Sequence, residues 1–162
     1  MLPIYRVGQI KELRQLKALV VKARARGKTV VLTNGCFDLL HRGHLHLLRE
    51  AKKLGDLLVV AVNSDSSVMK IKGPNRPIFP EMERAELLAA LELVDYVTVF
   101  PEPDPYHVIG ELRPDVLVKG GDWAQDRVIG REIVEGDGGK VAIIPLLPSH
   151  STTSIIERIS RD

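Results

Sequence analysis

Residues 33–44 read Thr33-Asn34-Gly35-Cys36-Phe37-Asp38-Leu39-Leu40-His41-Arg42-Gly43-His44, and they connect a strand pattern to a helix pattern. The run before them, 29–32, is β-branched and apolar, which predicts a buried strand. The residues after them, 45–54, place their apolar side chains on one stripe, as an amphipathic helix does. The stretch is therefore expected at the junction between a strand and the first turn of a helix.

Two histidines, His41 and His44, lie three residues apart at this junction, with Gly43 between them. Side chains at positions i and i+3 share one face of a helix, so both imidazoles should face the same way. The start of a helix also presents unpaired N–H groups and the positive end of the helix dipole, which favour phosphate. Gly43 has no Cβ, so a ligand can approach the backbone closely. These residue types together predict a cradle for a polyphosphate.

Two other interpretations of the histidine pair are open at this point. Both imidazoles would have only structural roles if they simply mark the start of a helix. A zinc site is the other alternative, but no third or fourth Cys, His or acidic residue lies at a suitable spacing. We therefore expect no metal site built by the protein itself.

The composition is that of an ordinary globular protein, with 162 residues, 44% hydrophobic and 27% charged. We expect one domain over residues 1–162, with residues 1–28 as an N-terminal helical lead-in. A net charge of +2 favours neither a nucleic-acid nor a membrane partner, and no apolar run is long enough for a membrane span. The single cysteine and the absence of a signal-peptide pattern favour the cytoplasm.

Strand and helix patterns alternate along the chain. Further apolar runs predict strands at 57–62, 96–100, 116–118 and 141–144. Helical spacing predicts helices at 9–26, 81–93, 104–112, 127–135 and 151–159, and a short helix from the 63–67 turn to Lys70. The Lys and Arg residues of 9–26 predict a solvated helix face, because no aromatic residues are interleaved with them. This order predicts an α/β fold with a Rossmann-like, doubly wound, five-stranded parallel sheet.

The unusual residues follow the ends of the predicted strands. They occupy 34–44, 63–65 and 120–123, and the 151–153 turn also follows a strand. In sheets of this kind ligands bind beyond the carboxyl ends of the strands, where the strand order switches direction. We therefore expect these segments to gather at one edge of the sheet and to form a single site.

The stretch 35–44 resembles the phosphate-binding motif of the cytidylyltransferase-like nucleotidyltransferases, which carry His-x-Gly-His. Further blocks follow in the order of that superfamily: 62–65, 72–78, Arg84 with Leu87-Leu88, 94–95, 114–123 and 151–153. Within the superfamily the chain is most similar to the enzymes that transfer AMP from ATP to D-glycero-β-D-manno-heptose 1-phosphate. Glycerol-3-phosphate cytidylyltransferases share most of these blocks and are the alternative, since spacing alone does not separate ATP from CTP.

The resemblance implies roles for individual residues. His41, His44 and Lys72 would be catalytic, and Lys72 would also contact the acceptor on a mobile loop. Arg76 and Arg84 would bind the acceptor phosphate, for which a planar bidentate donor is suited, unless either forms a surface ion pair instead. The implied nucleotide-binding residues are Asn34, Gly35, Phe37, Asp38, His41, Gly43, His44, Gly120, Gly121, Asp122, Trp123, Ser151, Thr152 and Thr153.

Some of these implied roles have alternatives. Asp38 would orient the turn or assist Mg²⁺, or it would cap the N-terminus of the helix. Trp123 would cover the base or fill the edge of the core. The resemblance also implies that Mg²⁺ enters with ATP and that the protein is a homodimer. Because a kinase precedes the transferase in many such enzymes and 162 residues leave no room for one, we expect a stand-alone transferase.

Overall fold

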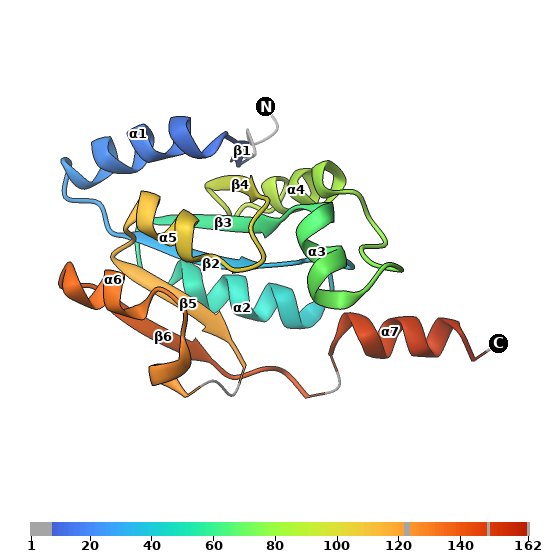
Figure 1. Ribbon diagram of the computed structural model, residues 1–162. Coiled ribbons are helices and arrows are strands. Elements are labelled where there is room, and N and C mark those ends of the chain that lie inside the picture. The colour runs from blue at the N-terminus through green and yellow to red at the C-terminus, as the bar shows by residue number, and fades with distance from the viewer. Residues whose placement is uncertain (1–7, 122–123, 149, 162) are drawn as a thin grey trace, which may run out of the picture.

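A computed structural model describes residues 8–121, 124–148 and 150–161 (Figure 1). Its centre is a six-stranded, all-parallel sheet with the order β1-β4-β3-β2-β5-β6. The strands are β1 (Gln9–Ile10), β2 (Val30–Gly35), β3 (Leu57–Asn63), β4 (Tyr96–Phe100), β5 (Val116–Gly120) and β6 (Lys140–Ile144). The helices are α1 (Leu13–Arg24), α2 (Arg42–Lys52), α3 (Asp65–Lys72), α4 (Glu81–Ala89), α5 (Tyr106–Leu112), α6 (Arg131–Gly136) and α7 (Thr152–Ile159), with a 3₁₀ turn, η1, at Gln125–Arg127.

Helices cover both faces of the sheet, so its central strands are buried on both sides. Successive strand residues point to opposite faces, and β2 shows this clearly. Val30 and Leu32 belong to one buried cluster with Leu16 of α1 and the buried residues of α5 and α6. Val31 belongs to the other cluster, with Leu48 of α2 and the buried residues of α4. The continuous apolar runs in the sequence therefore report a doubly wound sheet, as predicted.

The predicted five strands become six because the expected helix at 9–26 begins only at Leu13. Gln9 and Ile10 instead extend the sheet edge beside β4. The Gln9 N–H donates to the Asp95 carbonyl at 3.0 Å, and the Lys11 N–H donates to the Val97 carbonyl at 2.9 Å. Unpaired backbone groups at a sheet edge readily bind a passing segment, and here they override the local helical spacing.

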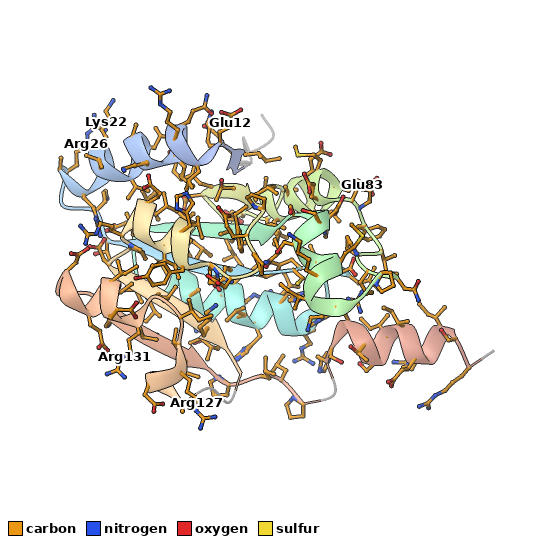
Figure 2. All side chains as sticks on the ribbon, in the orientation of Figure 1. Glu12, Lys22, Arg26, Glu83, Arg127 and Arg131 are labelled. Atoms are coloured by element: carbon orange, nitrogen blue, oxygen red, sulfur yellow. The ribbon has the colours of Figure 1, made fainter. Side chains whose placement is uncertain are left out.

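The basic residues around α1 form a solvated face. Lys22 and Arg26 are exposed, and Figure 2 shows both side chains at the outer edge of the molecule, away from the sheet. Among the described residues, no helix is both long enough and apolar enough to cross a membrane.

The strand order fixes where a ligand site is expected. From β2 the chain proceeds to β3 and β4 on one side, whereas β5 and β6 lie on the other side. The order therefore switches direction at β2, between its neighbours β3 and β5. Figure 1 shows α3 and α7 beyond the arrowheads of the strands, at the edge where loops leave the carboxyl ends.

Candidate active site

A cavity of about 480 Å³ opens at this edge of the sheet. It is lined by the ends of β2, β3 and β5, the start of α2, the end of α3 with the loop that follows, and the start of α7 with the residues before it. Five separate stretches of the sequence thus meet around one space. The sequence-predicted residues that line it are Asn34, Gly35, Phe37, Asp38, His41, Gly43, His44, Lys72, Arg76, Gly120, Ser151, Thr152 and Thr153.

The two histidines stack on each other at the start of α2. Their ring centroids lie 3.8 Å apart with an interplanar angle of 21°. His41 is the N-cap residue, and its Nδ1 accepts a hydrogen bond from the Gly43 N–H at 3.1 Å. A Cβ at position 43 would lie 2.9 Å from the His41 ring and 3.1 Å from the His150 carbonyl oxygen. Gly43 therefore makes room for His41, and its N–H is already paired instead of awaiting a phosphate.

Both imidazoles are neutral near pH 7. Burial, with a smaller contribution from His41, lowers the pKa of His44 to about 4. Burial and the nearby His150 also lower the pKa of His41 below its usual value. Because Nδ1 of His41 accepts an N–H, the proton of the neutral ring must be on Nε2. His41 thus presents an Nε2–H donor, and it does so without a charge.

Asp38 is buried and holds the loop that follows α3. Its carboxylate accepts hydrogen bonds from Ile78 N–H at 2.8 Å, from Phe79 N–H at 3.0 Å and from Arg76 Nε at 2.7 Å. Burial alone would raise the pKa of Asp38, but the bonds from Phe79, Ile78 and Arg76 outweigh it and lower the pKa. The helix-cap alternative is wrong, because His41 is the cap. Asp38 orients the turn and the loop beside it.

Arg84 does not line the cavity, so the expectation that it binds the acceptor phosphate is wrong. Its side chain is fully buried, and Nη1 donates to the carbonyl oxygens of Cys36 at 2.6 Å and Asn63 at 2.8 Å. Nε donates to the Phe79 carbonyl at 2.9 Å, and Nη2 pairs with Asp65 at 2.8 Å. A buried guanidinium needs such partners, and here they tie together the loop after β2, the end of β3 and the start of α4. The ion pair is therefore structural, and Arg84 is not a surface residue.

Lys72 and Arg76 do lie at the cavity, as predicted. Lys72 is exposed at the last position of α3, just before Gly73, whose φ of 97° turns the chain sharply into the following loop. Arg76 is half-buried and keeps its ion pair with Asp38. Among the described residues the Lys72 side chain has no hydrogen-bond or ion-pair partner, whereas Arg76 is positioned in advance by Asp38.

The start of α7 supplies hydroxyl groups to the cavity. The Ser151 hydroxyl accepts a hydrogen bond from the Ser154 N–H at 3.1 Å, and the Ser154 hydroxyl accepts one from the Ser151 N–H at 3.3 Å. These two reciprocal bonds form a capping box. Ser151 is thus occupied as an N-cap, whereas Thr152 and Thr153 line the cavity beside it. The apolar part of the cavity wall includes Leu47, Ile71 and Leu146, none of which we predicted.

The two predicted glycines differ. A Cβ on Gly120 would lie 3.3 Å from Leu47, so its absence keeps the apolar wall open. Gly121 does not line the cavity, and its φ of 126° lets its N–H reach the Ile144 carbonyl at 2.9 Å. The predicted contacts of Asp122 and Trp123 fall on residues outside the described part of the chain.

Sequence reasoning missed Lys119. It lines the cavity, and its Nζ donates to Oδ1 of Asn34 at 2.5 Å. Burial lowers the pKa of Lys119 to about 8. The available signal was a lysine directly after three apolar strand residues and directly before Gly120-Gly121, a position where a solvated lysine is unusual.

Comparisons with known proteins identify the family of this chain. A family model described as cytidylyltransferase-like matches residues 32–158. The chain is 53% identical over 152 residues to the bifunctional protein HldE of Syntrophotalea carbinolica and 50% identical to that of Geobacter sulfurreducens. Each match covers 94% of this chain but only 31% of the relative, so the chain spans about a third of those proteins.

Two solved structures are also similar. A lipopolysaccharide core biosynthesis protein from Thermoplasma volcanium superimposes with a TM-score of 0.61 at 34% identity, covering 75% of this chain and 98% of that one. A pantoate-beta-alanine ligase from Francisella tularensis gives a TM-score of 0.62 at 15% identity, covering 96% and 80%. The second likeness concerns the fold alone.

Proposed function

Because this chain belongs to the cytidylyltransferase-like family of nucleotidyltransferases, we propose that it transfers AMP from ATP to D-glycero-β-D-manno-heptose 1-phosphate. The products are ADP-heptose, a precursor of lipopolysaccharide or another surface glycan, and pyrophosphate. Similarity to HldE proteins and to a lipopolysaccharide core biosynthesis protein supports the sugar over the alternative glycerol 3-phosphate.

One observation carries the reaction type: neutral stacked imidazoles and cationic side chains converge on a cavity at the switch point of the sheet. In the proposed reaction an oxygen of the sugar phosphate attacks the α-phosphorus of ATP. The bond between the α-phosphorus and the bridging oxygen breaks, and pyrophosphate leaves with the electron pair. A phosphate monoester has a second pKa of about 6, so the nucleophile is already a dianion at neutral pH and needs no general base.

The work left to the protein is to hold two anions in line and to stabilise charge that develops on the leaving oxygen. The Nε2–H of His41 suits the triphosphate, because a neutral donor at the start of a helix stabilises negative charge without a proton transfer. His44 has its Nδ1 buried and without a hydrogen-bond partner in the described structure, so its Nε2 is the nitrogen left for a ligand. Lys72 and Arg76, which line the same cavity, suit the acceptor phosphate.

We also propose that Mg²⁺ arrives as part of the ATP substrate. Among the described residues, no group of three or more His, Cys, Asp and Glu is placed to hold a metal ion. Asp38, the carboxylate that lines the described cavity, is already bonded to the loop at 76–79. By the same family resemblance we propose a homodimer, and from the single cysteine we propose that it acts in the cytoplasm.

The test is turnover with defined substrates. The purified chain is incubated with ATP or CTP and with heptose 1-phosphate or glycerol 3-phosphate, and pyrophosphate release and product mass are measured. We expect ADP-heptose from ATP and heptose 1-phosphate, and little product from the other three pairs. Release with CTP and glycerol 3-phosphate alone would refute the proposed substrates.

A further inference from the structure

Lys119 lies at the point where the sheet changes direction. Thr33 of β2 pairs with Val118 of β5, so the next residues along the two parallel strands, Asn34 and Lys119, are also neighbours. The 2.5 Å bond from Lys119 Nζ to Asn34 Oδ1 bridges these strand ends, and both residues line the cavity. This is the position at which parallel α/β sheets bind their ligands.

The ammonium group of Lys119 has no counter-charge in the described structure. It is half-buried at the end of a strand whose preceding residues, 116–118, are buried. Asn34 is a neutral amide, and no ion pair joins Lys119 to a carboxylate within the described residues. Holding a cation in such a place is costly unless an anion completes the pair.

The groups that face the same cavity do not supply that anion. Lys72 and Arg76 are cationic, and His41, His44 and His150 are imidazoles. Cys36 also lines the cavity, and burial raises the pKa of its thiol above the usual 9.0. The carboxylate of Asp38 is bonded to Arg76 and to backbone N–H groups. Three cations against one carboxylate leave the described lining with two excess positive charges.

We propose that Lys119 is a phosphate-binding residue, whose ammonium group is held by Asn34 to pair with a phosphoryl group of the bound nucleotide. This inference rests on the proposed function and deepens it, because it names a residue that binds the nucleotide. Asn34 acts as a positioning residue, since its Oδ1 fixes the direction of the lysine before the ligand arrives. The Asn34 amide is a neutral acceptor, so a phosphate adds a charge–charge attraction that the bond to Asn34 lacks.

The pairing has a measurable consequence for pH. Burial lowers the pKa of Lys119 in the free protein to about 8, and a bound phosphate would raise it. The group is therefore mostly protonated at pH 7 and mostly neutral at pH 9 before binding. If the bound lysine stays charged, the Kd of the nucleotide rises about tenfold between these pH values. The pKa of His41, His44 and Asp38 is lowered and that of Cys36 is raised, so each of these shifts moves the group's titration away from the pH 7 to 9 interval.

The experiment measures the Kd of Mg-ATP by calorimetry at pH 7 and pH 9, without acceptor, for the wild type and the variants K119R, K119M and K140M. For the wild type we expect the Kd of Mg-ATP to rise about tenfold from pH 7 to pH 9. K140M is the control and should behave like the wild type, because Lys140 is exposed at the opposite end of the neighbouring strand β6. In K119R the Kd should change less than twofold between the two pH values, since a guanidinium stays charged. K119M should bind at least tenfold more weakly at pH 7 and show no pH slope.

Two results would overturn the assignment. One is K119M with the melting temperature and the pH 7 affinity of the wild type. The other is K119R with the same tenfold loss between pH 7 and pH 9 as the wild type, which decides the matter even if K119M does not fold. The proposed function is judged separately by turnover. If the Kd of Mg-ATP depends on pH through Lys119 but no ADP-heptose forms, the proposed acceptor is rejected. If K119M binds Mg-ATP and turns over as the wild type does, the role of Lys119 is rejected.

Discussion

Replacing Gly43 with alanine would add one methyl group at the most crowded point of the histidine pair. The new Cβ would lie 2.9 Å from the Nδ1 and Cε1 atoms of His41 and 3.1 Å from the His150 carbonyl oxygen. Because contacts below 3.0 Å do not persist, the His41 ring must move. Its movement breaks the bond from the Gly43 N–H, worth about 1 kcal/mol, and disturbs the stacking on His44, worth about 0.5–1.5 kcal/mol.

The gain in helix propensity offsets much of this loss, since alanine is favoured over glycine inside a helix by roughly 0.5–1 kcal/mol. We therefore expect G43A to unfold in urea within about 1 kcal/mol of the wild type. Activity should fall much further, because a donor displaced by about 1 Å costs on the order of 100-fold in rate. Pyrophosphate release gives kcat/KM, and urea unfolding followed by circular dichroism gives stability.

The matched control is G136A. Gly136 ends α6, and a Cβ there would meet nothing within 4 Å, so the rate should not change and stability should rise by at most about 1 kcal/mol from helix propensity. Wild-type turnover in G43A would refute the reasoning, because it would mean that the His41 position does not matter. A large loss of stability in G43A would also refute it, since the fold itself would then depend on the glycine.

Other perturbations test the remaining assignments. R84M should lose about 3 kcal/mol or more of unfolding free energy, because three carbonyls and Asp65 lose their buried partner. The control R131M removes an exposed i,i+4 ion pair and should lose under about 1 kcal/mol. Equal losses in urea titrations would contradict the structural role of the buried Arg84. The pKa of His44 is lower in the folded than in the unfolded state, so between pH 6.5 and 4 the unfolded chain binds more protons and the free energy of unfolding should fall. H44Q should show a shallower fall in the free energy of unfolding over this range. A slope equal to that of the wild type would show that His44 is not buried in its neutral form. R76A should raise the KM of the sugar phosphate more than that of ATP in initial-rate assays, and equal effects on both would rule out the acceptor role.

The sequence alone determined the fold class and the edge of the sheet that carries the site. Alternating buried runs and amphipathic stripes depend on local periodicity, which survives without knowledge of neighbours, and β2, β3 and α2 follow it closely. The rule that parallel strands share a carboxyl edge then brings Asn34, His41, Lys72 and Thr152 to one cavity. The short strand β1 was missed because two residues carry no periodicity and pair only with an edge that β4 provides.

Only the tertiary structure decided what each charged residue does. Arg76 and Arg84 are the same residue type within one short segment, yet one lines the cavity and the other is buried among carbonyl oxygens. Asp38 holds a loop 40 residues away, and Lys119 meets Asn34 across two strands 85 residues apart. The role of a charge is set by its burial and its partners, and these come from distant parts of the chain that no local pattern records.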